Sequence, residues 1–230
     1  YTTKWNGVFE DLVPITAKHS YKNKVQVSTS VFNFQAVDSI DKAELKLFEY
    51  PAADRWNYNP ILGATDIAAS ERLRKWNGKL GSFRQVHMLI CVFKNLPREA
   101  AERQEDYWKG GNKNEFILCL GIDDSKKVKW SHVISWTEEE KLKIEVRDEA
   151  MEIGYDLVKI VDYMATNVQK KFQRKEFADF NYLKIEPTSR AVMITFFITL
   201  ILTIGLSIFF VMNEFTFHKP GGSGPTRRYR

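Results

Sequence analysis

The chain has 230 residues, enough for one large or two small hydrophobic cores. Its hydrophobic share of 44% excludes a protein that is disordered by composition. Its formal net charge of +5 is compatible with an anionic membrane surface and is too small to indicate nucleic-acid binding. Cys91 and Cys119 both lie inside apolar runs, which predicts two buried free thiols and no disulfide framework. Tyr1 in place of an initiator methionine leads us to expect a processed or truncated product.

Residues 1–60 are interpreted as an N-terminal extension or a small β-rich arm. Residues 24–34 and 43–50 alternate between apolar and polar side chains, which predicts a strand in each. Residues 51–60 are bracketed by prolines and predict a loop. Aromatic side chains of this region suit a contact arm, because Trp and Tyr are common at interfaces, and they equally suit closing the core of the domain. These aromatic residues are Trp5, Phe9, Trp56 and Tyr58.

Residues 61–180 carry the pattern of an α/β domain. Helical spacing predicts helices over residues 66–80, 96–108 and 155–176, the first capped by Thr65 or Asp66 and ended with help from Gly78 and Gly81. Apolar runs predict buried strands over 86–93 and 115–122, and residues 127–136 predict a third strand that closes a β-hairpin. The expected architecture is therefore a central mixed β-sheet flanked by helices.

Residues 137–146 allow two interpretations. Thr137 and Glu140 have the spacing of a capping box, which predicts a helix start. Residues 142–146 alternate as a strand does, so both structures stay open for this segment.

The glycines at 110 and 111 raise the question of a phosphate-binding loop. A P-loop places its glycines before a helix, so that the helix amides meet the phosphate. Here the glycines follow a predicted helix and precede a predicted strand. We therefore predict that Gly110 or Gly111 stops the helix in a positive-φ conformation and that Trp108 packs at the helix end.

Residues 191–212 are uncharged and predict a single transmembrane helix. A helix of this length spans about 33 Å, close to the thickness of a hydrocarbon core. Residues 181–190 form a juxtamembrane linker, and residues 213–230 form a basic, Gly-rich tail predicted to be flexible. Because both flanks are basic, the orientation is left open. Small residues inside the span would let a partner helix approach closely, and arginines of the tail would meet anionic lipid or an acidic partner. These residues are Gly205, Ser207, Arg227 and Arg228.

The pattern over about residues 66–180 resembles the TPM domain family. The resemblance rests on Asp66-Ile67-Ala68 at the first helix, on the buried strand that ends near Val92, and on the helix that ends in Trp108. It also rests on Gly110, Gly111 and Asn114 before FILCLGI and on the hairpin DDSKK. The resemblance implies an α/β domain that many members follow with one membrane span. It also implies a weak phosphatase activity or calcium binding. The segment VISWTEEE argues against these activities, because it lacks the glycine that family members have after the hairpin.

Three acidic residues are the candidate metal ligands: Asp66, Asp123 and Asp124. Carboxylates suit calcium, but calcium takes six or more oxygen ligands and only two of these residues are adjacent. No cofactor is therefore expected, with calcium as the one candidate. His87 and His132 lack a third zinc ligand at sensible spacing and are expected to be hydrogen-bonded histidines of the fold. No catalytic residue is predicted.

The sequence favours an integral, single-pass membrane protein of an organelle inner membrane, such as the mitochondrial one, or of a bacterial cell envelope. Its domain is expected to bind other membrane-protein subunits as an accessory or assembly subunit, with the lipid bilayer as second partner and without nucleic acid. Two alternatives are a membrane-tethered phosphatase-like hydrolase with a divalent metal and a receptor or trafficking adaptor.

Overall fold

The computed structural model describes residues 8–9, 33–51, 58–176, 179 and 187–212. The chain divides into two compact units, residues 1–180 and residues 181–230, which are described separately. The predicted strand over residues 24–34 lies almost wholly outside the described residues.

A mixed sheet forms the centre of the first unit. Its strands, in spatial order and as far as the chain is described, are β1 (Ile61–Leu62), β2 (His87–Lys94), β3 (Glu115–Ile122) and β4 (Val128–Ser135). β1, β2 and β3 run parallel, and β4 returns antiparallel to β3. The register pairs Cys91 with Cys119 on neighbouring strands, and both are buried free thiols as predicted.

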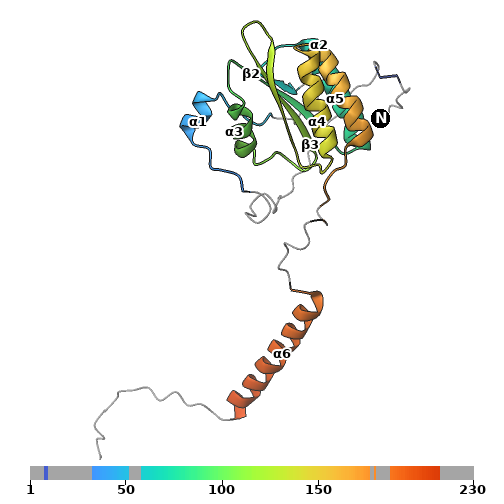
Figure 1. Ribbon diagram of the computed structural model, residues 1–230. Coiled ribbons are helices and arrows are strands. Elements are labelled where there is room, and N and C mark those ends of the chain that lie inside the picture. The colour runs from blue at the N-terminus through green and yellow to red at the C-terminus, as the bar shows by residue number, and fades with distance from the viewer. Residues whose placement is uncertain (1–7, 10–32, 52–57, 177–178, 180–186, 213–230) are drawn as a thin grey trace, which may run out of the picture. The chain divides into compact units, whose positions relative to one another are not determined.

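Helices cover both faces of this sheet (Figure 1). They are α1 (Ser39–Glu44), α2 (Ile67–Phe83), α3 (Glu99–Tyr107), α4 (Glu140–Ile153) and α5 (Leu157–Lys171). One apolar core lies between the sheet and α2, α4 and α5. The second core lies on the opposite face, under α3 and the chain around Leu47 and Phe48. The predicted mixed sheet with flanking helices is confirmed.

The strands and helices follow from simple patterns. Every residue of β3 is buried, which agrees with its unbroken apolar run, because a central parallel strand is covered on both faces. The side chain of Asp66 caps α2 by accepting a hydrogen bond from the Ala69 amide at 2.9 Å. In α5 the predicted apolar stripe, including Ile160, Met164 and Val168, is fully buried.

Two sequence predictions are wrong. Residues 43–50 do not form a strand. Residues 43 and 44 belong to the short helix α1, which Asp38 caps with hydrogen bonds from the Ile40 and Asp41 amides, and the Gln104 side chain pairs with the backbone of Phe48. Gly78 and Gly81 do not end α2, which continues to Phe83. A glycine inside a helix costs about 1 kcal/mol, which burial of a side chain such as Leu80 offsets.

The ambiguous segment after β4 is a helix. α4 begins at Glu140 with Glu139 as its N-cap, and no side chain caps it. Thr137 Oγ1 instead accepts a hydrogen bond from the Glu139 amide at 3.3 Å, so the predicted capping box does not form. The helix is favoured over the strand because it buries Leu142, Val146 and Ala150 along one face.

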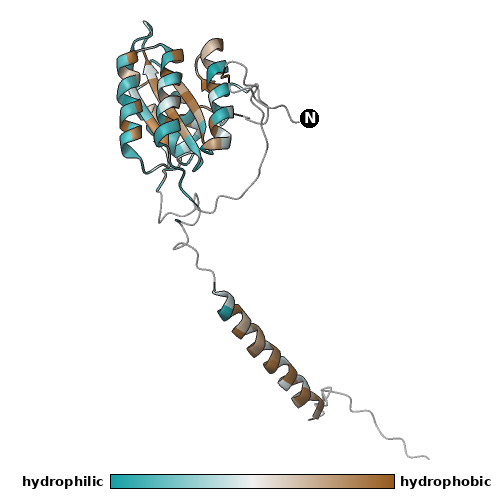
Figure 2. Ribbon diagram, turned by 90° about the vertical axis from the view of Figure 1, so that its right-hand side faces the viewer, coloured by the Kyte–Doolittle hydropathy of each residue, from teal (hydrophilic) through white to brown (hydrophobic). Residues whose placement is uncertain are grey.

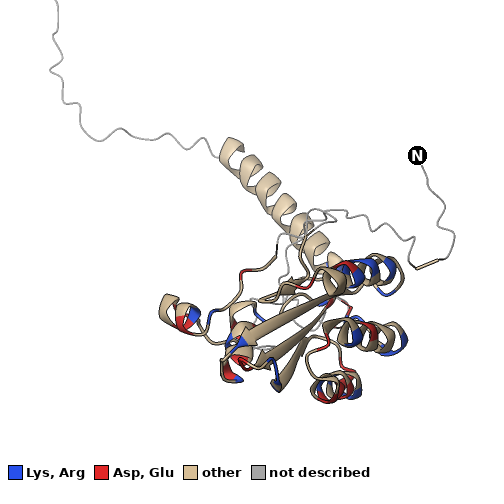
Figure 3. Ribbon diagram, turned by 90° about the horizontal axis from the view of Figure 1, so that it is seen from above, with Lys and Arg blue, Asp and Glu red and all other residues tan. Residues whose placement is uncertain are grey.

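The second unit contains α6 (Ser189–Met212), a helix of 24 residues. It is mostly hydrophobic (Figure 2), with hydroxyl side chains at Thr195, Thr199, Thr203 and Ser207, and after Arg190 it carries no charged residue (Figure 3). Its length and composition are sufficient to cross a membrane, as predicted for residues 191–212.

Candidate functional site

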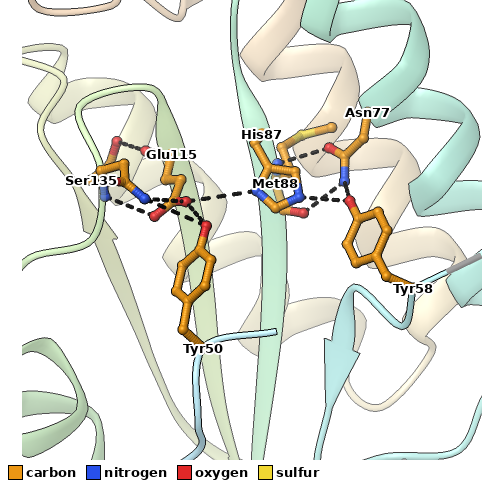
Figure 4. Close-up of polar contacts among 8 residues, drawn as sticks. Tyr50, Tyr58, Asn77, His87, Met88, Glu115 and Ser135 are labelled. Atoms are coloured by element: carbon orange, nitrogen blue, oxygen red, sulfur yellow. Dashed lines mark hydrogen bonds and ion pairs between the residues drawn. The ribbon is translucent and has the colours of Figure 1, made fainter. Parts of the chain in front are cut away.

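A polar cluster lies at the amino ends of β2 and β3 (Figure 4). His87 is the first residue of β2 and Glu115 the first residue of β3, and the parallel register places them side by side. Tyr50 and Tyr58 reach the cluster from the chain before β1, and Asn77 reaches it from α2. Strand register therefore joins side chains that are far apart in the sequence.

Glu115 is the centre of the cluster and is only 2% exposed. One carboxylate oxygen accepts a hydrogen bond from the Asn112 amide at 2.8 Å. The other accepts hydrogen bonds from Asn112 Nδ2 at 2.9 Å and from the Tyr50 hydroxyl, and it lies 3.8 Å from Nδ1 of His87. A buried carboxylate is tolerated only with such partners, because an unpaired buried charge costs several kcal/mol.

His87 joins this carboxylate to a second set of polar groups. Its Nε2 lies 2.6 Å from the Tyr58 hydroxyl, and that hydroxyl accepts a hydrogen bond from Asn77 Nδ2 at 3.0 Å. When the Tyr58 hydroxyl donates its one proton to Nε2, a neutral His87 carries its ring proton on Nδ1, facing Glu115. The side chains then form one continuous chain of polar contacts from α2 to β3.

Burial and charge shift the pKa values of this cluster in opposite directions. Burial raises the pKa of Tyr58 to about 12, and burial together with the nearby Glu115 charge raises the pKa of Tyr50 further. Burial alone would also raise the pKa of Glu115. The contact with His87 and the hydrogen bonds from Tyr50 and Asn112 outweigh burial and hold that pKa below its usual value. The cluster therefore keeps an ionised carboxylate beside two neutral phenols at neutral pH.

Two buried amide side chains hold the neighbouring backbone in place. Asn77 accepts a hydrogen bond from the Met88 amide at 2.8 Å and donates one to the Met88 carbonyl at 2.9 Å. In the same way, Gln104 pairs with both the amide and the carbonyl of Phe48, at 2.7 and 3.1 Å. Each amide pairs with the N–H and C=O of its backbone partner as a neighbouring strand would, so the backbone groups of Phe48 are satisfied although Phe48 lies outside the described strands.

A pocket of about 350 Å³ opens beside Glu115. Its wall consists of Glu49, Tyr50, Tyr107, Trp108, Gly111 and Asn112. The rings of Tyr50 and Trp108 meet edge to face, with centroids 5.5 Å apart. The pocket therefore combines aromatic surface with one carboxylate at its rim and a second one behind its wall.

The Gly-rich loop forms part of this wall. Gly110 and Gly111 both have positive φ, +74° and +71°, which confirms the predicted helix stop after α3. A Cβ atom on Gly111 would lie 2.8 Å from a carboxylate oxygen of Glu115, so only glycine allows this close approach. Trp108 is 8% exposed and donates from Nε1 to the Phe48 carbonyl at 3.0 Å, as expected of a packing residue.

The predicted metal ligands lie away from this pocket. Asp66 is the N-cap of α2 after β1, while Asp123 and Asp124 follow β3, and protein groups contact each of them. Asp123 accepts hydrogen bonds from Ser125 Oγ and the Lys127 amide, and these bonds lower its pKa well below the usual range. Among the described residues no three His, Cys, Asp or Glu side chains converge in a way that could hold a metal ion.

The predicted partner-binding residues are dispersed. Phe9 packs on Trp76 of α2, with ring centroids 4.7 Å apart, and Tyr58 belongs to the polar cluster, so both contribute to the domain itself. The Ser207 hydroxyl bonds back to the Thr203 carbonyl within α6 at 2.8 Å, and Gly205 has open space around it. The remaining candidates, Trp5, Trp56, Arg227 and Arg228, lie outside the described residues.

Sequence reasoning missed Glu115, Tyr50 and Asn112 as members of a site. The only signal was positional: a charged residue that begins an otherwise apolar strand directly after a Gly-Asn loop. His87 has the same position at the start of β2. Two polar residues that open neighbouring parallel strands are expected to meet at the same edge of the sheet.

Comparison of the chain with models of protein families, with curated proteins and with solved structures found no match. The resemblance to the TPM domain family therefore stays a prediction from the sequence pattern.

Proposed function

We propose that this protein is a single-pass membrane protein whose α/β domain acts by binding, as an accessory or assembly subunit of a larger membrane complex. The membrane is proposed to be an organelle inner membrane or a bacterial cell envelope. The observation that carries the proposal is α6.

Two other kinds of segment share the length and hydropathy of α6. A core helix of a soluble protein is mostly buried, whereas the described side chains of α6 are all exposed. A signal sequence lies near an amino terminus, whereas α6 follows the folded domain. A helix that is apolar all round and has no protein cover is stable in lipid, because the hydrocarbon then buries its surface.

Binding is favoured for the domain because hydrogen bonds position three side chains of its pocket wall. The Tyr50 hydroxyl is fixed on Glu115, the Tyr107 hydroxyl on Glu49 at 2.8 Å, and the Trp108 indole on the Phe48 carbonyl. A wall fixed before a partner arrives loses little conformational entropy on binding. Anchoring in lipid adds to this effect, since it raises the effective concentration of the domain beside other membrane subunits.

Alkaline carbonate extraction tests the anchor directly. The full chain is expected to stay with the membrane pellet, as is a control carrying Leu200→Ala and Ile204→Ala. The pair Leu200→Arg and Ile204→Arg is expected to release the chain, because each arginine at the centre of a membrane helix costs about 3 kcal/mol. Release of the unmodified chain by carbonate would contradict the proposal.

A membrane-tethered hydrolase is the second candidate function, because three aspartates follow parallel strands of the sheet. Asp66 follows β1 and Asp123 and Asp124 follow β3, and ligands of α/β domains bind outside the carboxyl ends of parallel strands. Full-length protein in detergent can be assayed with a generic phosphomonoester, with and without a divalent metal. Metal-dependent turnover that Asp123→Asn abolishes would favour the hydrolase over the binding module.

A further inference from the structure

We propose that the pocket beside Glu115 binds the guanidinium group of an arginine side chain presented by a partner protein. The inference deepens the proposed function, on which it rests, by naming the chemistry that the domain recognises. Three features carry it: the aromatic wall, the carboxylates of Glu49 and Glu115, and a lysine that already contacts two wall residues.

The wall offers a ligand ring surface rather than polar hydrogens. The hydroxyl groups of Tyr50 and Tyr107 and the indole N–H of Trp108 already donate to acceptors of the protein. Ring faces carry partial negative charge, so cations bind over them when they lie within about 6 Å of a ring centroid. A guanidinium group suits such a wall better than a compact ammonium, because it is planar, weakly hydrated and able to stack.

Two carboxylates lie at the pocket, with Lys42 and Lys109 close by. Glu49 lies in its wall and the ionised Glu115 lies directly behind Tyr50 and Asn112. The resident cation Lys42 pairs with Glu49, and His87 stands 3.8 Å from Glu115 on the far side. From the described residues, the Glu49 carboxylate accepts one hydrogen bond on each oxygen, from Lys42 and Tyr107, and each oxygen has a second lone pair for a further donor.

Lys42 shows that this wall holds a cation. Its Nζ donates a hydrogen bond to the Tyr107 hydroxyl oxygen at 2.9 Å, lies 4.8 Å from the centroid of the Tyr107 ring, and pairs with Glu49. The wall adds the rings of Tyr50 and Trp108, and Glu49, the carboxylate that pairs with Lys42, is also the carboxylate of this wall. A volume of about 350 Å³ is at the low end for ligand sites and fits one side chain rather than a cofactor.

Membrane topology excludes the C-terminal tail of the same chain as the source of the arginine. The arginines of the C-terminal tail, Arg227, Arg228 and Arg230, follow α6 in the sequence. If α6 spans the membrane once, these residues emerge on the side opposite the domain and cannot reach the pocket of their own chain. A partner with an exposed arginine on the side of the domain has no such restriction.

The test is calorimetric titration of the full chain in a non-ionic detergent with capped peptides. Ac-Gly-Arg-Gly-NH₂ is expected to bind at least about 10-fold more tightly than the same peptide with citrulline, which has the same shape without charge. Equal affinities for the two peptides would overturn the proposal. Agmatine, a free guanidinium compound, tests the source: much tighter binding of agmatine than of the arginine peptide would overturn the assignment to a partner protein.

Three variants separate recognition from general damage to the fold. Tyr107→Leu and Glu49→Gln are each expected to weaken the arginine peptide about 5-fold or more. Lys42→Met is expected to strengthen it several-fold, because the resident ammonium no longer occupies Glu49. Weakened binding in Lys42→Met, or unchanged binding in Tyr107→Leu, would overturn the proposal. Glu44→Gln, an exposed residue of α1 outside the pocket wall, is the matched control with unchanged affinity expected.

The peptide titration and the carbonate extraction test the two proposals independently. Loss of arginine selectivity with normal carbonate resistance would remove the pocket assignment and leave the membrane anchor intact. Carbonate release with normal arginine selectivity would do the reverse.

Discussion

The acidic residues at the two ends of the parallel strands β1 to β3 have different surroundings. These two ends are here called the amino edge and the carboxyl edge of the sheet. At the amino edge, Glu115 is buried and held by the side chains and amides of several segments. At the carboxyl edge, Asp123 and Asp124 lie in the turn between β3 and β4, where Lys129 and Lys94 pair with them at 3.0 and 3.1 Å. At the amino edge, several segments thus depend on the Glu115 carboxylate for buried hydrogen bonds. At the carboxyl edge, Asp123 and Asp124 make their contacts in an exposed turn.

This difference identifies the edge at which an acidic residue organises its surroundings. Removal of Glu115 would leave donors from Tyr50 and Asn112 without acceptors in a water-poor region, whereas removal of Asp123 exposes its donors to solvent. We therefore expect substitutions at the amino edge to affect stability and pocket shape together. Substitutions of Asp123 and Asp124 are expected to affect only the hairpin turn.

The largest expected effect is that of Glu115→Ala. It is expected to lower the free energy of unfolding by about 3 kcal/mol, because it leaves buried hydrogen-bond donors and His87 without their partner. Thermal unfolding of the full chain in detergent, followed by near-UV circular dichroism, measures the change. Glu44→Ala on the exposed face of α1 is the control, and an equal loss in both variants would argue against a special contribution of the amino edge.

Acidic pH is expected to remove part of the stabilisation that the ionised Glu115 contributes to the fold. The folded-state pKa of Glu115 is lowered, so its stabilisation is present above the unfolded value of about 4.3 and is lost as the pH falls through the lower folded value. The difference in unfolding temperature between the unmodified chain and Glu115→Gln should therefore narrow from pH 7 to pH 3. The other acidic residues are common to both proteins, so a constant difference would show that Glu115 is not ionised in the fold.

Alkaline pH is expected to lower the stability by a smaller amount, and this loss occurs as the pH rises. The pKa of Tyr58 is raised to about 12, so stability that is present below pH 10 is lost as the pH rises from 10 towards 12. Absorbance at 295 nm should show Tyr58 ionising later than a tyrosine with the ordinary pKa of 10.0. Tyr58→Phe should remove one late-ionising group, and an unchanged late phase would contradict the buried position of this hydroxyl.

The smallest expected effect is that of Asp123→Asn. An asparagine side chain still accepts the hydrogen bonds from Ser125 and the Lys127 amide, and only the pairing with Lys129 is weakened in solvent. The unfolding temperature should fall only slightly, and Ac-Gly-Arg-Gly-NH₂ should bind unchanged. A loss as large as that of Glu115→Ala would remove the contrast between the two edges.

Local patterns were sufficient to predict most of the fold. The apolar runs of β2 and β3, the cap at Asp66 and the stripe of α5 each depend on neighbours in the sequence, so spacing predicts them. Residues 43–50 were predicted wrongly because side chains distant in the sequence, such as Gln104, pair with the backbone of Phe48. β1 was missed because two residues between Pro60 and Gly63 carry no usable period.

The candidate site was much less predictable from the sequence. Its members come from five separate segments, and only the parallel register of β2 and β3 brings His87 beside Glu115. The candidate ligands Asp66, Asp123 and Asp124 were chosen for their chemistry, which says nothing about what already contacts them. α6 is the opposite case, because a membrane span is defined by length and composition alone.

Cross-linking in intact native membranes tests the central claim, that the anchored domain binds a partner through its amino edge. Lys42 and Lys109 mark this edge beside the pocket, and the exposed Lys94 and Lys126 mark the carboxyl edge. We predict that an amine-reactive cross-linker joins Lys42 or Lys109 to one recurrent membrane-protein partner, at a peptide that contains or adjoins an arginine. Cross-links that arise only from Lys94 and Lys126, or a chain that stays uncross-linked in its membrane, would contradict the claim.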